Sequence, residues 1–184
     1  VARAPGSLRL FDTHRGGTML AAREAYHAEA WGRLAGDTAP RDLTWSQETW
    51  IPAIGRDGGS YLIQHVSSLD GTTYLRRAGN EPIRLGDGQA TGLSPDGARA
   101  VHVMSDSRVT LVPLGAGEPR RVSTAGLKEV HTVKFLPDGQ GLLLQASEGD
   151  GRLRLFVQDS PDAHPRAVTP DGVGGVEMAS GAIT

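Results

Sequence analysis

The chain has 184 residues, of which 38% are hydrophobic, and this is enough to bury a sizeable core. Its 19 basic and 21 acidic side chains nearly cancel to a formal net charge of −2, which argues against a nucleic-acid-binding surface. The absence of cysteine excludes disulfide bonds, thiolate catalysis and cysteine-ligated zinc, and no apolar run approaches the length of a membrane span, so we expect no membrane insertion by these residues.

Two sequence markers recur in step along the chain. The first is a glycine in a recurring local context, at Gly17, Gly58, Gly97, Gly139 and Gly181, with spacings of 41, 39, 42 and 42 residues. The second is a proline with an apolar residue three positions later, at Pro40, Pro82, Pro119 and Pro165. A period of this length indicates a repeat architecture, and the 25 glycines and 11 prolines favour short strands and turns over helices. We therefore predict an all-β fold, a partial β-propeller with four four-stranded antiparallel blades plus the start of a fifth.

The first predicted blade, about residues 1–46, fits the repeat least well. Its turn reaches Gly17 without the proline and aspartate that are found before the glycine in later blades. Residues 19–34 have high helix propensity, whereas the repeat predicts two strands here with a turn near residues 27–29. We follow the repeat, because helix propensity is a weak preference that tertiary packing overrides.

The next three predicted blades cover residues 47–88, 89–124 and 125–170. Each begins with a strand that enters an Asp-Gly turn, and in the third and fourth blades a proline precedes the aspartate. Proline fixes φ at the first corner of the turn, and Asp-Gly supplies the positive φ that such hairpin turns require. The residues that we assign to these structural turns are Asp57, Gly58, Pro95, Asp96, Gly97, Pro137, Asp138 and Gly139.

Residues 171–184 match only the start of a fifth blade. Because closed propellers typically have about four to eight blades, an extra partial blade argues against a complete four-bladed ring. We expect a single propeller region that belongs to a longer protein, with open blade faces through which it can associate with itself. The compartment stays undecided, since a chain without cysteine persists in the cytosol and in the periplasm alike.

No motif for catalysis, cofactor binding or metal binding stands out, and we expect no cofactor. Residues 92–97 are one residue too long for the Gly-x-Ser-x-Gly turn that carries a nucleophile, and no Gly-x-x-x-x-Gly-Lys phosphate loop occurs. The six histidines lack ligand spacing, although His65 and His102 both fall in second strands and point to the same side. A metal shared by these two is the alternative to two structural histidines. We favour structural histidines, because a metal site needs three or four converging ligands.

Tryptophans are the best candidates for contact with a partner. Trp45 and Trp50 flank the predicted junction between the first two blades, and Trp31 lies within the first blade. Packing between blades is the alternative that we favour for all three, because aromatic side chains dominate cores as well as interfaces.

The strand-turn segments at residues 93–97 and 135–139, which read Leu-Ser-Pro-Asp-Gly and Phe-Leu-Pro-Asp-Gly, resemble the repeat of TolB-type β-propellers. The resemblance extends over nearly the whole chain, and it fails at the first and last turns, which lack both the proline and the aspartate. A narrower resemblance is carried by residues 41–45 and by segments within residues 69–97. It is to propellers that lie C-terminal to bacterial serine/threonine kinase domains or winged-helix domains.

This resemblance implies a non-catalytic protein-interaction or sensory module of a larger bacterial signalling protein. Its protein or peptide partner, of unknown identity, would be held by loops at the rim of the central channel. Two alternatives stay open: the propeller of a prolyl-oligopeptidase-like hydrolase that gates substrate access, and a TolB-like envelope scaffold. The full-length sequence discriminates among them, through an upstream kinase glycine-rich loop, a downstream nucleophile elbow or a secretory signal.

Overall fold

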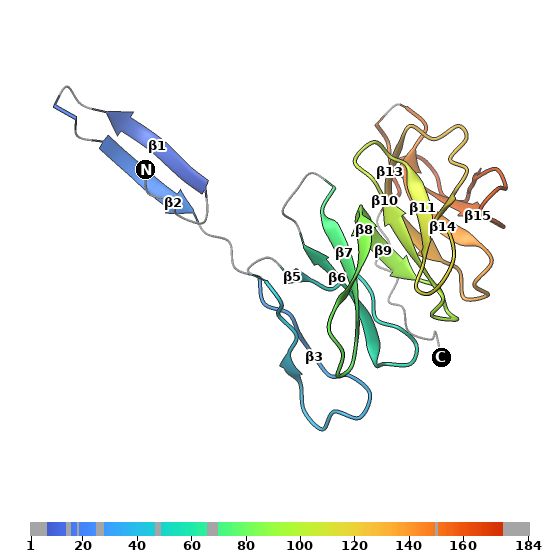
Figure 1. The fold of residues 1–184 in the computed structure, drawn as a ribbon. Helices are drawn as coiled ribbons and strands as arrows, with labels where there is room; N and C mark the ends of the chain where they lie inside the picture. The colour runs from blue at the N-terminus through green and yellow to red at the C-terminus, as the bar shows by residue number, and fades with distance from the viewer. Residues whose placement is uncertain are drawn as a thin grey trace.

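The computed structural model of the protein describes residues 7–13, 16–17, 19–24, 28–46, 49–65, 70–149 and 151–174. Every regular element in this part of the chain is a β-strand (Figure 1). The strands are β1 (Ser7–Thr13), β2 (Met19–Glu24), β3 (Trp31–Gly32), β4 (Arg41–Asp42), β5 (Thr49–Trp50), β6 (Ser60–His65), β7 (Thr72–Arg77), β8 (Ile83–Asp87), β9 (Gln89–Leu93), β10 (Arg99–Val103), β11 (Val109–Pro113), β12 (Arg120–Arg121), β13 (Glu129–Phe135), β14 (Leu142–Ser147), β15 (Arg154–Gln158) and β16 (Arg166–Ala167).

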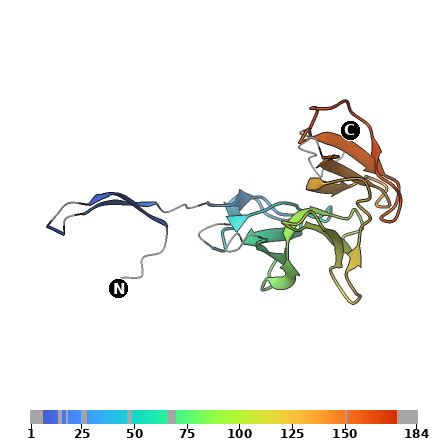
Figure 2. The same ribbon diagram turned by 90° about the horizontal axis from the view of Figure 1, so that it is seen from above.

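Three four-stranded antiparallel sheets form the body of the molecule. They contain β5–β8, β9–β12 and β13–β16, and in each sheet the strands pair in chain order. The sheets follow one another side by side along an arc (Figures 1 and 2). This arrangement confirms the predicted all-β fold and the partial β-propeller. Within the described ranges there is no helix with the length and apolar character needed to cross a membrane.

The middle strands of these sheets are largely buried on both faces, because neighbouring units or segments pack against them. In β6 five consecutive residues are buried, and in β10 four are. One apolar cluster fills the boundary between the second and third units and a larger one fills the boundary between the third and fourth. Members of the larger cluster that are fully buried include Val101, Val133, Leu142 and Leu144. Burial of these side chains between sheets is the main stabilising contribution to the arc.

The first hairpin of each four-stranded sheet turns at a glycine with positive φ. These are Gly58, Gly97 and Gly139, with φ of 64°, 68° and 73°. The preceding aspartate caps the turn: Asp57 Oδ1 accepts the Ser60 N–H at 3.0 Å, and Asp138 Oδ1 accepts the Gln140 N–H at 2.9 Å. Because these hydrogen bonds favour the carboxylate, they hold the pKa of Asp57 and of Asp138 below its ordinary value.

Two long side chains link sheets that are not neighbours in the arc. The Arg56 guanidinium of the second unit donates to the Pro137 carbonyl in the fourth-unit turn, at 3.4 Å. The Lys134 ammonium of β13 donates to the Pro52 carbonyl of the second unit, at 3.5 Å. The segments around Pro52 and Arg56 in the second unit and around Lys134 and Pro137 in the fourth unit, which we call the inner ends, are therefore close enough for a single side chain to bridge them.

The first unit differs from the other three. The expected four strands are present, but they divide into two two-stranded sheets, β1–β2 and β3–β4, in place of one four-stranded blade. The β1–β2 hairpin lies apart from the other sheets in both views (Figures 1 and 2). The described part of residues 19–34 contains strands and no helix, as the repeat predicted.

The short length of β3 explains this division. It pairs with β4 at only two positions, Trp31 with Asp42 and Gly32 with Arg41. Glycine weakens a strand because it has no side chain to pack. At Gly32 a Cβ would lie 2.8 Å from Leu43 Cδ1, so any larger residue here would displace the end of that side chain. A strand of this length offers β2 fewer ladder hydrogen bonds than β7 offers β6.

Candidate functional site

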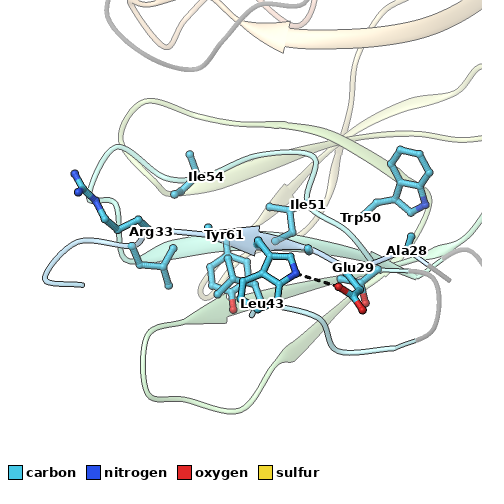
Figure 3. A pocket seen from close by; sticks show the side chains of 13 residues that line it. Ala28, Glu29, Arg33, Leu43, Trp50, Ile51, Ile54 and Tyr61 are labelled. Atoms are coloured by element: carbon cyan, nitrogen blue, oxygen red, sulfur yellow. Dashed lines mark hydrogen bonds between the residues drawn. The ribbon is translucent and has the colours of Figure 1, made fainter. Parts of the chain in front are cut away.

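An open hollow lies between the first two units. We call it the tryptophan groove and define it by Trp31, Leu34, Leu43, Trp50, Ile51, Ile54 and Tyr61, which line it (Figure 3). Its volume is about 610 Å³. Leu34, Leu43 and Tyr61 are buried and form the floor, whereas Trp31 and Trp50 each keep 63% of their surface exposed. The groove is therefore an open apolar surface with aromatic walls.

Local sequence explains why Trp50 faces outward. In β5 the side chains alternate, so that Thr49 is buried and Trp50 is exposed. Thr49 is fixed by its hydroxyl, which accepts the Trp45 N–H at 3.0 Å and the Ser46 N–H at 2.8 Å and donates to the Ser46 carbonyl. This turn orients β5, and with it the indole of Trp50.

The opposite wall is built from β3 and the turn after it. Trp31 Nε1 donates to Glu29 Oε2 at 3.1 Å, which orients the indole (Figure 3). Leu34 is turned toward the floor by a tight bend, in which Asp37 Oδ2 accepts the Leu34 N–H at 3.0 Å. Glu29 and Arg33 are the charged residues that line the groove, so its charged groups come from one wall.

The two predicted contact residues are not brought together. Trp50 lines the groove, whereas Trp45 packs on Tyr74 in an edge-to-face pair with ring centroids 4.4 Å apart. Trp45 is 42% exposed, and like Trp31 and Trp50 it is not buried between sheets. The packing alternative that we favoured is therefore not what the structure shows for these tryptophans. Trp31 and Trp50 line an open groove instead.

The two second-strand histidines are separated and differ in environment. His102 is buried between the second and third units, with Nδ1 3.3 Å from the Asp87 carbonyl oxygen. Burial lowers the pKa of His102, so the ring is neutral near pH 7. His65 instead shares a 3.0 Å hydrogen bond with the Ser46 hydroxyl. No group of three or more potential metal ligands occurs among the described residues. His14 and His27 lie outside the described residues.

The Ser46–His65 pair has the distance of a nucleophile and its base, but its surroundings are those of a turn. The Ser46 hydroxyl is also 3.3 Å from the Thr49 hydroxyl, which belongs to the same turn. A catalytic pair needs a third group that orients the histidine. No ion pair between His65 and a carboxylate is present in the described part of the chain.

A second, smaller hollow lies between the third and fourth units, beside the loop that joins β10 to β11. Its volume is about 330 Å³, and Ser107, Glu129 and His131 are among the polar residues that line it. The Ser107 hydroxyl accepts the Val130 N–H at 3.1 Å, and His131 Nε2 lies 3.9 Å from Glu129 Oε2. This hollow is polar and has exposed charges, so it offers less binding energy than the tryptophan groove.

The assigned turn residues have a structural place. A Cβ on Gly139 would lie 3.4 Å from Pro95 Cδ, so the turns of the third and fourth units touch. Asp96 Oδ1 accepts the Ala98 N–H at 3.0 Å. None of these turn residues lines the tryptophan groove.

Comparison with known proteins places the fold. No family model and no curated protein matches the chain. Among solved structures, TolB from Acinetobacter baumannii is similar over 72% of this chain at 16% identity, with a TM-score of 0.62. A putative TolB from Agrobacterium tumefaciens is similar over 91% at 18% identity, also with a TM-score of 0.62. The chain has a TolB-like β-propeller fold.

The TolB-like similarity concerns the fold only. The chain spans 35% of the Acinetobacter protein and 63% of the Agrobacterium protein, so it corresponds to part of each propeller-containing chain. It confirms the Pro-Asp-Gly resemblance seen in the sequence. At these identities the function has to be inferred from the site itself.

Sequence reasoning missed most of the groove. Trp31 was noted but not selected, and Leu43 was seen only as the apolar residue that follows Pro40. The usable signal was the phase of the repeat, which puts Leu34 and Leu43 on the side of the first unit that faces the second. Tyr61 gave no such signal, because its covering depends on a strand of another unit.

Proposed function

We propose that this TolB-like propeller region is a non-catalytic protein-interaction module, and that the tryptophan groove binds a partner segment in extended conformation. The observation that carries the proposal is that two exposed indoles, those of Trp31 and Trp50, lie beside a strand edge that has no partner strand in the described residues. The edge of β3 opposite β4 is not paired with another strand in the described residues. An extended peptide can add to such an edge while its apolar side chains enter the neighbouring groove.

The energetics support binding at this position. An exposed apolar surface that combines aromatic walls and a buried floor is typical of interaction sites. Covering one indole removes about 100 Å² of apolar surface from water, which is worth about 2–3 kcal/mol before ordering costs. Two indoles and one short stretch of strand pairing are then sufficient for specific, reversible binding.

The wider context of this module is also part of the proposal. The resemblance of residues 41–45 to kinase-associated propellers supports a sensory role in a bacterial signalling protein, and Leu43 of this segment lies in the groove floor. The similarity to TolB structures favours the second candidate, an envelope scaffold. The gene sequence on both sides of this segment decides between them. A kinase domain upstream supports the first, and a secretory signal supports the second.

Selection of peptides from a random display library tests the groove. We expect the selected peptides to carry alternating apolar residues, and we expect Trp50→Ala to weaken their binding by about ten-fold or more. Ile83→Ala is the matched control, because Ile83 is a 53% exposed apolar residue on β8 that does not line the groove. Binding that is unchanged in both Trp50→Ala and Trp31→Ala, with folding verified by circular dichroism, would exclude the groove as the contact surface.

A further inference from the structure

We propose that the β1–β2 hairpin is the resident occupant of the tryptophan groove. It docks within its own chain, with β2 along the edge of β3 opposite β4, and a partner segment must displace it. The docking is inferred from the repeat and from contacts of the described residues, whereas the displacement step rests on the function proposed above. The structure shows the undocked arrangement, in which the hairpin lies apart from the sheets (Figure 2).

The position of β2 in the repeat is that of a second strand. Strand β2 begins two residues after Gly17 and ends seven residues after it. Strand β6 begins and ends at the same sequence offsets from Gly58. Six residues connect β2 to β3, and six connect β6 to β7, which pair along their full length. A β2–β3 hairpin therefore needs no longer connection than the second sheet already has.

The apolar clusters show which contact is missing at the groove. At each closed boundary a second-strand residue, four positions after the repeat glycine, packs against the next unit: Leu62 shares a cluster with Ala100, and Val101 with Leu144. The cluster beneath the groove has no second-strand residue of the first unit among the described residues. The buried members of that cluster are Leu34, Leu43, Tyr61 and Ile63. The corresponding β2 residue is Ala21, which is exposed.

Side-chain size is complementary across the boundary between the second and third units. Between the second and third units a large residue, Leu62, meets a small one, Ala100. Beneath the groove Tyr61 and Ile63 are large and already covered, at 2% and 0% exposed, so a strand that docks above them has room only for a small residue. Ala21 meets this requirement. Because protein interiors pack to a nearly constant density, this match favours β2 over an arbitrary strand.

The hairpin of a second copy could fill the same place, because it has the same sequence. The connection length favours docking within one chain, since the six residues between β2 and β3 already suit a hairpin. Exchange of a hairpin between copies would give a dimer. The test is arranged to distinguish these two arrangements.

A disulfide bond can report the docked state, because the chain has no cysteine of its own. In the second sheet Ile63 is opposite Tyr74, and the same repeat positions in the first unit are Ala22 and Arg33. Directly opposite strand residues have a Cα separation of about 5 Å, which suits a disulfide bond. We therefore propose the variant with Ala22→Cys and Arg33→Cys. The control carries Met19→Cys with Arg33→Cys. In the docked arrangement Met19 lies three residues along β2 from the position opposite Arg33, so these two cysteines are too far apart to form a disulfide bond.

After mild oxidation we expect an intramolecular disulfide in the Ala22/Arg33 variant, much less in the control, and a monomeric product on a non-reducing gel. Covering the indoles should lower acrylamide quenching of tryptophan fluorescence about two-fold, and reduction should restore it. Equal crosslinking in the control, no crosslinking, or crosslinking between two chains only would each overturn docking within the chain.

Peptide binding separates this inference from the proposed function. If the hairpin occupies the groove, oxidation of the Ala22/Arg33 variant should weaken binding of the selected peptide about ten-fold, and reduction should restore it. A disulfide that forms without changing a Trp50-dependent binding would overturn the displacement step and leave the proposed function intact. Peptide binding that never depends on Trp50 would overturn the proposed function, while the quenching measurement would still decide whether the hairpin docks.

Discussion

The chain repeats one unit, yet two boundaries between neighbouring units differ: one is packed with apolar side chains and the other is an open groove. Between the third and fourth units, Val101 and Leu144 are fully buried in one cluster. Between the first two units the floor residue Tyr61 is covered, but Trp31 and Trp50 stay largely exposed. The difference is the second strand of the earlier unit, because β10 packs on the next sheet and β2 does not. In this chain the boundaries between complete four-stranded sheets are closed, and the boundary beside the divided first unit is open.

The largest expected loss of stability comes from a substitution at the closed boundary between the third and fourth units. Leu144→Ala should lower the free energy of unfolding by about 3–4 kcal/mol, because it leaves a cavity among fully buried neighbours. Leu43→Ala in the groove floor should lower it by only about 2 kcal/mol, since solvent reaches the space that is left. Urea denaturation of the two variants provides the measurement. Equal losses would show that the groove is as tightly packed as the closed boundary.

A smaller effect is expected from His102, which occupies in the third unit the place of Ile63 in the second. Burial lowers the pKa of His102 below 6.5, so below that pH the unfolded chain binds a proton that the folded chain does not. Stability should be complete above pH 6.5 and fall as the pH drops, by at most about 1.4 kcal/mol per pH unit.

The variant His102→Gln should remove this part of the pH dependence. Urea midpoints at pH 7, 6 and 5 measure it, and His131→Gln is the control because His131 is exposed. An unchanged slope in His102→Gln would mean that another group causes the acid loss.

The smallest effect is expected in the open boundary. In the undocked arrangement that the structure shows, Trp50→Ala should change the free energy of unfolding by less than about 0.5 kcal/mol, because the indole is 63% exposed there. Thermal unfolding of Trp50→Ala beside Leu144→Ala measures the contrast. A loss well above this value would show that Trp50 is covered in solution, as docking of the β1–β2 hairpin in the groove requires.

The phase of the glycine repeat was sufficient to predict the strands. It placed strands rather than a helix in residues 19–34, and it located the turns at Gly58, Gly97 and Gly139, where positive φ is required. These features are local, since they depend on turn chemistry and on alternation within about ten residues. The division of the whole chain into blades remains a prediction.

The state of the first unit could not be predicted in the same way. Whether β2 pairs with β3 depends on the two-residue length of β3 and on Gly32, whose missing side chain makes room for Leu43. Alternation in β5 turns Trp50 outward, but alternation alone does not show whether a strand of the neighbouring unit covers it. Sequence reasoning therefore identified Trp50 as a contact candidate but favoured packing between blades for it.

The two bonds that join the second and fourth units also restrict the middle of the arc. Arg56 and Lys134 both reach across to backbone carbonyls, of Pro137 and Pro52, so little aperture is left between these inner ends. Substitution of Arg56 and Lys134 by alanine would remove both links and let the second and fourth units move apart without loss of any sheet hydrogen bond.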